Sequence, residues 1–381
     1  MNQKLPTLSK IRKKQLKDFL DFLESESVHF MGYPCSGVYN YDELLPLLRY
    51  SINNIGDPYL PSNYHLNTHS FECEILSYFK RLTHAKEPTW GYVTNGGTEG
   101  NLYGLYAARE RFNNQAVAYY SEDSHYSINK NMHLLNLNSK SVATTDNGEI
   151  DYQAFEKWLI KDKAKKVIIS VNLGTTMKGA VDDVSKIKAI FKKLAINEYY
   201  IHADAAFFGM VLPFLRPKVA FGFETGIDSI AISGHKMIGS PIPCGICLVK
   251  EKYVHRLTRD IEYIGTLDKT ITGSRNGITP MFLWYFVNTS TEKTISKHVQ
   301  KCFDNADYIL QKFKALNINA WRNPHSFIVV FDKCAPNLLS RWQIAVNGNN
   351  AHIIPMPHIN REIIDDFFND LIKEGQTVEV N

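Results

Sequence analysis

The sequence predicts an α/β protein with a large, mostly parallel sheet domain and a smaller α+β domain at the carboxyl end. Two observations predict this class. Between about residues 90 and 250, seven short apolar segments alternate with helical segments, which is typical of a parallel sheet covered by helices on both faces. Beyond about residue 290, a long helical segment precedes mixed strand-like and helical stretches. A chain of 381 residues is long enough for two domains.

The expected elements follow in a regular order. Apolar residues at helical spacing predict helices over 9–29 and 71–82, with an irregular stretch between them. The strands of the large sheet are expected at 90–93, 116–120, 141–143, 167–171, 199–202, 229–233 and 245–249, and the helices between them at 99–112, 126–135, 152–161 and 184–194. A helix over 292–315, a strand over 326–331, a second helix, a strand over 351–356 and a last helix over 359–373 are expected next. We therefore divide the chain into an amino-terminal helix and arm (1–60), a large domain (61–290) and a small domain (291–381).

Composition and charge exclude several classes of protein. The 43 basic and 39 acidic residues leave a net charge of only +4, so neither nucleic acid nor a membrane is an expected partner. The basic clusters at 10–17 and 161–166 are interpreted as solvated helix faces. No apolar run approaches the roughly 18 residues that span a bilayer, and the polar amino terminus does not resemble a signal peptide. Six scattered cysteines predict free thiols and a cytoplasmic protein.

Cys244 and Cys247 have the C-x-x-C spacing of redox sites and half-zinc sites. However, no second pair of Cys or His residues stands at the distance that a zinc site needs, and the segment 243–249 has the pattern of a buried strand. We therefore interpret both cysteines as structural and expect no metal site.

The first chemical feature is a glycine turn that follows the expected strand at 90–93. Gly96 and Gly97 let the backbone approach a ligand closely, and the free N–H groups at the start of the next helix favour a phosphate. Thr98 adds a hydroxyl donor. The segment is neither a P-loop, because no lysine follows, nor a G-x-G-x-x-G fingerprint. A glycine turn that only caps a helix stays open as an alternative.

Three further side chains follow other expected strands, and in sheets of this class ligands bind beyond the carboxyl ends of the strands. Asp204 lies among alanines, where a carboxylate needs a cationic partner; a helix cap is the alternative. Lys236 follows Ser233 among small residues, and its amine suits covalent catalysis, whereas a solvated surface lysine is the alternative. His125 can stack on an aromatic ring or be an ordinary core histidine.

The order of these features is more specific than any one of them. A glycine turn, a histidine, an aspartate and a Ser-x-His-Lys segment, each after a strand, form the layout of pyridoxal phosphate (PLP) enzymes of the aspartate-aminotransferase fold type (fold type I). Within that fold the chain resembles the group II pyridoxal-dependent amino-acid decarboxylases, and among them the bacterial histidine decarboxylases and the plant serine decarboxylases. The resemblance runs from about residue 32 to near the carboxyl terminus and is carried by the segments 51–54, 90–101, 124–127, 148–152, 174–176, 202–206, 233–245 and 273–277.

The resemblance implies a cofactor and roles for the site residues. It implies a seven-stranded PLP-binding domain in which the cofactor is attached to Lys236 as a Schiff base, Asp204 keeps the pyridine nitrogen protonated, and His125 stacks on the ring. These three are the expected catalytic residues. It also implies a homodimer or higher homo-oligomer with the site at the subunit interface, where segment 272–274 reaches the neighbouring subunit's phosphate. The residues expected to bind the cofactor are Gly96, Gly97, Thr98, His125, Thr175, Asp204, Ala206, Ser233, His235 and Lys236.

The implied activity is the α-decarboxylation of a small amino acid, which makes the chain a carboxy-lyase. Segments 90–101 and 236–245 resemble the histidine enzymes more closely, so conversion of L-histidine to histamine and CO2 is the favoured reaction. Conversion of L-serine to ethanolamine and CO2 is the alternative, because the serine enzymes are resembled more closely at 56–58, 282–285, 299–302 and 341–343. Phe207 and Ile278 depart from both groups and Phe208 departs from the bacterial one. A PLP-binding protein without catalysis is a remote alternative, and Lys236, Asp204 and His125 together argue against it.

Overall fold

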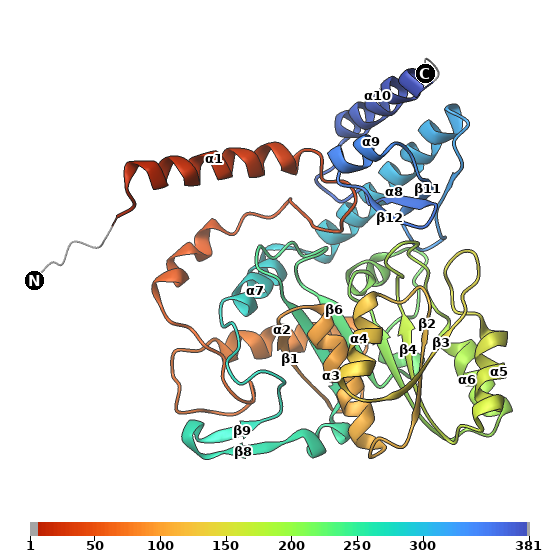
Figure 1. Cartoon of the computed structure of the whole chain (residues 1–381). Helices are drawn as coiled ribbons and strands as arrows, with labels where there is room; N and C mark the ends of the chain where they lie inside the picture. Colours follow the sequence, from red (N-terminus) through yellow and green to blue (C-terminus); the bar gives the residue numbers. More distant parts are fainter. Residues whose placement is uncertain (1–6, 379–381) are drawn as a thin grey trace, which may run out of the picture.

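The computed structural model describes residues 7–378, and a seven-stranded sheet lies at its centre (Figure 1). The expectations for residues 1–6 and 379–381 lie outside the described residues. The strands follow the order β1-β7-β6-β5-β4-β2-β3, and β7 runs antiparallel to both of its neighbours while the other pairs are parallel. The fold class predicted from the alternating segments is therefore confirmed. The strands are β1 (Thr89–Thr94), β2 (Val117–Ser121), β3 (Asn138–Val142), β4 (Lys166–Asn172), β5 (Glu198–Asp204), β6 (Ser229–Ser233) and β7 (Gly245–Lys250).

Helices cover both faces of this sheet because its strands are apolar on both sides. In β4, Ile168 packs in the core cluster on one face, whereas its neighbours Val167 and Ile169 pack in the cluster on the other, as the two-residue period of a strand requires. Phe155, from the helix before β4, and Ile187, from the helix after it, bury their side chains in the second cluster. The helices around the sheet are α2 (His69–Leu82), α3 (Gly97–Arg111), α4 (Tyr126–Leu134), α5 (Tyr152–Asp162), α6 (Val184–Lys193) and α7 (Thr279–Thr289).

A second sheet of four antiparallel strands lies in the carboxyl-terminal region, in the order β10-β11-β13-β12. Two long helices cover it, and the stacked rings of Phe313 and Phe331, 4.7 Å apart, join a helix to the sheet. The elements are α8 (Glu292–Ala315), β10 (Ala320–Trp321), β11 (Val329–Asp332), α9 (Pro336–Arg341), β12 (Ala345–Asn347), β13 (Asn350–Ile353) and α10 (Arg361–Val378).

The predicted amino-terminal helix is α1 (Lys10–Ser27), which stands away from the rest of the chain in Figure 1. None of its side chains is buried, and Leu16, Phe19, Leu20 and Leu23 are all exposed. Within residues 7–378, no helix has the length and apolar character to cross a membrane.

Several short elements were not predicted from the sequence. These include α7, β10, β12, the hairpin of β8 (Arg259–Ile261) and β9 (Thr266–Asp268), and the short 3-10 helix η1 (Asp42–Arg49) in the irregular stretch. The strand expected at 141–143 is β3, which begins at Asn138, because its first residues are polar and lie at the sheet edge. The remaining 3-10 turns are η2 (Phe208–Met210), η3 (Leu212–Phe214), η4 (Phe223–Thr225), η5 (Glu251–Tyr253), η6 (His255–Leu257) and η7 (Glu262–Ile264).

Candidate active site

The carboxyl ends of β4, β5 and β6 open on a cavity of about 1150 Å³. Its walls come from the strand ends, the amino termini of α3 and α4, the arm at 32–34 and the second sheet. All ten residues that the sequence singled out as a cofactor site line this cavity, although they are spread over some 140 positions of the chain. β1, β2, β4, β5 and β6 run in the same direction and end at one edge of the sheet, and this arrangement brings the residues together.

The glycine turn lies where β1 passes into α3. Gly96 has a φ of +145° and caps the helix, a conformation that favours glycine. At Gly97 an added Cβ would lie 2.8 Å from the Oγ atom of Ser233 and 3.2 Å from the Cβ atom of Ala206. The main chain therefore lies against the end of β6, and Thr98 follows in the first helical turn, whose N–H groups have no partner within the helix. The turn is suited to hold a phosphate.

Asp204 is the last residue of β5, and a chain of hydrogen bonds holds its carboxylate. Its Oδ2 accepts from the Nδ2 of Asn101 at 2.8 Å, and its Oδ1 accepts from the backbone N–H of Ala206 at 3.1 Å. The Oδ1 of Asn101 lies 2.9 Å from the Nε2 of His202, and the Nδ1 of that ring lies 2.7 Å from the Oγ of Ser229. Since the amide oxygen can only accept, Nε2 carries the proton and Ser229 donates to Nδ1.

This chain of hydrogen bonds requires a neutral imidazole at His202. Burial lowers the pKa of His202 to about 4, although the charge of Asp204 opposes the shift. Asn101 therefore accepts one hydrogen bond from His202 at its amide oxygen and donates one from its amide nitrogen to the Asp204 carboxylate. Asn101 and Ser229 had no role in the sequence interpretation, because their positions relative to Asp204 depend on the packing of α3 against the sheet.

Lys236 lies just beyond β6 and is half-buried at the wall of the cavity. Burial lowers the pKa of its amine, while Asp204 and Cys35 act in the opposite direction. The main chain here is tightly held, since the Lys236 carbonyl accepts from the N–H groups of Ser36 and Gly239 at 3.0 and 3.1 Å. A lysine amine with a lowered pKa is a better nucleophile at neutral pH.

His125 caps α4 at the rim of the same cavity. Its Nδ1 accepts from the backbone N–H of Ser127 at 3.3 Å and lies 2.8 Å from the hydroxyl of that residue. Burial lowers the pKa of His125, the Asp204 carboxylate raises it and Lys236 lowers it further. The ring is therefore held by its Nδ1 edge and kept neutral, which suits a flat surface against an aromatic group.

Two more predicted residues are held by backbone contacts. The hydroxyl of Thr175 accepts from the N–H of Ala180 at 2.9 Å in the turn after β4. The Nδ1 of His235 lies 3.0 Å from the carbonyl oxygen of Cys244, and burial lowers the pKa of this ring.

Of the two cysteines with C-x-x-C spacing, Cys247 lies in the buried strand β7, where its thiol donates to the carbonyl of Gly100 at 3.3 Å. The side chain of Cys244 is also buried in the core, so both cysteines pack inside the protein.

The residues that depart from the related families lie in different places. Phe207 lines the cavity, whereas the ring of Phe208 packs against Gly174, where an added Cβ would approach it to 2.5 Å. Ile278 and the segment 272–274 do not line the cavity. A substrate in this chain's cavity can therefore meet Phe207 directly.

One wall of the cavity was missed in the sequence interpretation. His352, from β13, lies with its Nδ1 3.0 Å from the carbonyl of Met177 and its Nε2 2.9 Å from the carbonyl of Gly32. This ring joins the second sheet, the turn after β4 and the amino-terminal arm. No local signal marks it, because the three segments are far apart in the chain.

The residues present fit PLP. A half-buried lysine amine, a hydrogen-bonded carboxylate and a glycine turn at a helix amino terminus face one cavity. They match the aldehyde, the pyridine nitrogen and the phosphate of that cofactor. The fold and the site together define the class of PLP-dependent enzymes of fold type I.

Comparison with known proteins narrows this class. The family model "Pyridoxal-dependent decarboxylase conserved domain" matches residues 71–333. A histidine decarboxylase of Vibrio campbellii is 42% identical over 368 residues, which cover 94% of this chain and 95% of the relative. A histidine decarboxylase of Pseudomonas entomophila is 41% identical over 377 residues, covering 98% and 93%. The chain belongs to the pyridoxal-dependent decarboxylase family, and it is a carboxy-lyase that uses PLP.

Solved structures agree with this assignment. The L-methionine decarboxylase from Streptomyces sp. 590, in its internal aldimine form, superposes with a TM-score of 0.86 at 26% identity, covering 97% of this chain and 96% of that one. The glutamate decarboxylase of Lactobacillus brevis superposes with a TM-score of 0.78 at 18% identity, covering 98% and 93%, and shares the fold.

Proposed function

We propose that the protein converts L-histidine to histamine and CO2. The observation that carries the proposal is the grouping of Lys236, Asp204 and His125 around one cavity in a chain that is 42% identical to a histidine decarboxylase over nearly its whole length. L-serine is the second candidate, favoured by the segments that resemble the plant serine enzymes.

Each residue has a defined task in this reaction. PLP, when bound, supplies an electron sink for the electrons that the departing carboxylate leaves behind. The Nζ of Lys236 holds the cofactor and gives way to the substrate amine, and its lowered pKa keeps it able to return. The Asp204 carboxylate, oriented by Asn101, would accept a hydrogen bond from the pyridine N–H and so keep that nitrogen protonated. His125 covers one face of the ring and excludes water.

The remaining contacts hold and orient the cofactor. The main-chain N–H groups of the glycine turn and the hydroxyls near it would bind the phosphate of PLP. The residues at the ends of β4 and β5 would contact the edge of its pyridine ring. The proposed cofactor-binding set is Gly96, Gly97, Thr98, His125, Thr175, Asp204, Ala206, Ser233, His235 and Lys236.

A panel of the twenty amino acids, with CO2 measured and amine products identified by mass, tests the substrate. Histamine as the main product supports the proposal, and ethanolamine would establish serine as the substrate instead. Release of a keto acid or glycine in place of an amine would contradict decarboxylation. Lys236→Ala should abolish both amine release and the visible absorbance of the attached cofactor. Lys250→Ala, which removes another partly buried lysine outside the cavity, is the matched control.

We further propose a homodimer with segment 272–274 at the partner's cofactor. The apolar residues of α1 support an association, because Leu16, Phe19, Leu20 and Leu23 are exposed on a single helix. Light scattering of the purified protein should give twice the mass of 43.6 kDa, and a Leu20→Glu variant should shift it toward the monomer. A monomer for the wild-type protein would refute the assembly.

The division into 1–60, 61–290 and 291–381 is likewise our proposal, supported by the separate seven-stranded and four-stranded sheets. Limited proteolysis that cuts near residues 60 and 290 would support it, whereas first cuts inside either sheet would contradict it.

We also propose a cytoplasmic location, which is supported by the six cysteines, all of which are free thiols. Cell fractionation tests the location.

A further inference from the structure

β1 is an edge strand of the seven-stranded sheet, and its end leads directly into the glycine turn. Its inner side pairs with β7, and no strand within residues 7–378 lies on its outer side. At Val93 a buried ion pair takes the place of the missing strand. The N–H of Val93 donates to the Oε1 of Glu72 at 2.8 Å, and its carbonyl accepts from the Nη1 of Arg275 at 3.4 Å.

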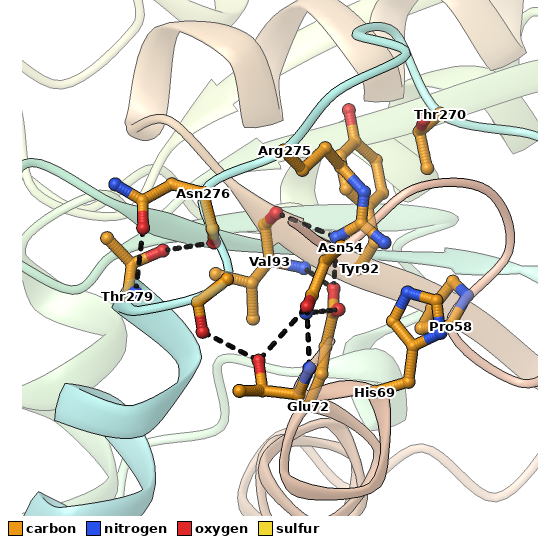
Figure 2. Close-up of polar contacts among 12 residues, drawn as sticks. Asn54, Pro58, His69, Glu72, Tyr92, Val93, Thr270, Arg275, Asn276 and Thr279 are labelled. Carbon is orange, nitrogen blue, oxygen red and sulfur yellow. Dashed lines mark hydrogen bonds and ion pairs between the residues drawn. The ribbon is translucent and has the colours of Figure 1, made fainter. Parts of the chain in front are cut away.

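This ion pair is closed off from water. Figure 2 shows Glu72 gathered with Asn54, Val93 and Arg275, and the exposed fractions of the two charged side chains are 0% and 2%. The Nη1 of Arg275 donates to Glu72, and the Nδ2 of Asn54 donates to the other carboxylate oxygen at 2.7 Å. The Nη2 of Arg275 donates to the carbonyl of Gly56 at 3.1 Å. Because a buried charge without its partner is costly, each group is confined to one position.

A second carboxylate holds the chain beyond Thr94. The Oε2 of Glu99 accepts from the backbone N–H of Asn95 at 2.8 Å, and its Oε1 accepts from the hydroxyl of Tyr92 at 2.8 Å. The guanidinium of Arg275 lies 5.4 Å from the centre of the Tyr92 ring. The main chain is thus held on both sides of Thr94, immediately before the turn begins.

We propose that the Glu72–Arg275 pair positions the phosphate-binding turn. By fixing both main-chain groups of Val93, the pair sets where β1 ends and therefore where the N–H groups of Gly97 and Thr98 point. Neither charged residue lines the cavity, so the pair acts through the main chain and touches no reacting atom. The inference rests on the proposed function, in which this turn holds the cofactor phosphate.

The test compares two ligands that differ only in the phosphate. The apoprotein is titrated with PLP and with pyridoxal, and absorbance and tryptophan fluorescence give a dissociation constant for each. In the double variant Glu72→Met/Arg275→Met, which leaves no unpaired charge, the preference for PLP over pyridoxal should fall roughly tenfold, as expected when a hydrogen bond to a charged ligand is misplaced. Pyridoxal affinity should stay near the wild-type value.

Arg275→Lys serves as a milder variant if the double variant does not fold. It keeps the charge, but an ammonium group cannot reproduce the fork that reaches Glu72, Val93 and Gly56 together, so a smaller fall in the same preference is expected. Circular dichroism and urea unfolding confirm that each variant is folded. Equal losses for the two ligands, or an unchanged preference, would overturn the proposal.

A matched control comes from the amino end of β6, away from the glycine turn. Asp228 also accepts from a strand N–H, that of Ile201 at 3.0 Å, and lies 3.2 Å from the Nζ of Lys250. Asp228→Asn should reduce stability without changing the preference for PLP. Gly97→Ala tests the phosphate site itself and should lower the preference. If only Gly97→Ala lowers it, the positioning role is wrong and the phosphate site stands; if Gly97→Ala leaves it unchanged, both are wrong.

Discussion

Lowering the pH should destabilise the protein through His202, which lies behind Asp204 in the active site. Burial lowers the pKa of this ring from 6.5 to about 4. Between these two values the unfolded chain binds more protons than the folded protein, so the stability that depends on His202 is present above pH 6.5 and is lost as the pH falls to about 4. The window is 6.5 − 4 = 2.5 pH units, and at 1.36 kcal/mol per unit it amounts to about 3 kcal/mol. The ring is fully buried, so no correction for solvent screening is needed.

The assay compares the wild-type protein with His202→Gln, whose amide can still donate to Asn101. Free energies of unfolding in urea are measured at fixed protein concentration from about pH 4 to pH 7, and the advantage of the wild-type protein should grow by about 3 kcal/mol over that range. The unfolding free energies of the two proteins are subtracted because other groups also change protonation in this pH range. Burial raises the pKa of Asp182 to about 6, so its contribution changes with the opposite sign and cancels between the two proteins.

A variant of an exposed histidine provides the control for this measurement. His133 lies exposed on α4, and His133→Gln controls for the loss of an imidazole that packs against nothing in the core. If the His202→Gln difference does not grow with pH beyond that of His133→Gln, the ring of His202 is not held neutral and the hydrogen-bond chain to Asp204 is wrong.

Three changes at or near the cavity have expected outcomes of their own. Asp204→Asn keeps the shape of the side chain but removes its charge, so the decarboxylation rate should fall by roughly 10²–10³-fold; an unchanged rate in a CO2 assay would contradict its role. Gly104→Ala should cost about 1–3 kcal/mol of stability in urea, because an added Cβ would lie 2.2 Å from the Nδ1 of His202, whereas Gly37→Ala, with its nearest atom at 3.4 Å, should be nearly neutral. The rate of cofactor attachment to the apoprotein, followed by stopped-flow absorbance, should rise with pH and reach a plateau below the ordinary lysine pKa of 10.5. The reason is that the neutral amine is the reactive form and burial lowers the pKa of Lys236. A rate that still climbs through pH 10.5 would exclude this.

Local patterns in the sequence predicted most of the large sheet and its helices. The run from Val167 to Val171 predicted β4 because buried parallel strands are apolar on both faces. The hairpin of β8 and β9 was missed because each strand has three residues, too few for a two-residue period to be visible. α7 was missed because it is apolar nearly all round, so its sequence lacks the polar stripe of a surface helix.

The site residues likewise fall into those that the local sequence marks and those that only tertiary packing brings together. Asp204, Lys236 and the glycine turn each stand at or just beyond the end of a strand, so a local signal marked them. Asn101 left no such signal, since its partner Asp204 is 103 residues away and the contact depends on how α3 packs across the sheet.

The sequence by itself determined which chemical groups the chain carries and which of them end a strand or begin a helix. These properties depend on residues a few positions apart, through apolar periodicity and the conformational preferences of glycine. The tertiary structure alone decided that Glu72, 203 residues from Arg275, closes the outer edge of β1, and that Asn101 and His202 orient Asp204. Hydrophobic burial has no direction, so such pairs are specified only when strand order and register place their hydrogen-bonding groups in contact.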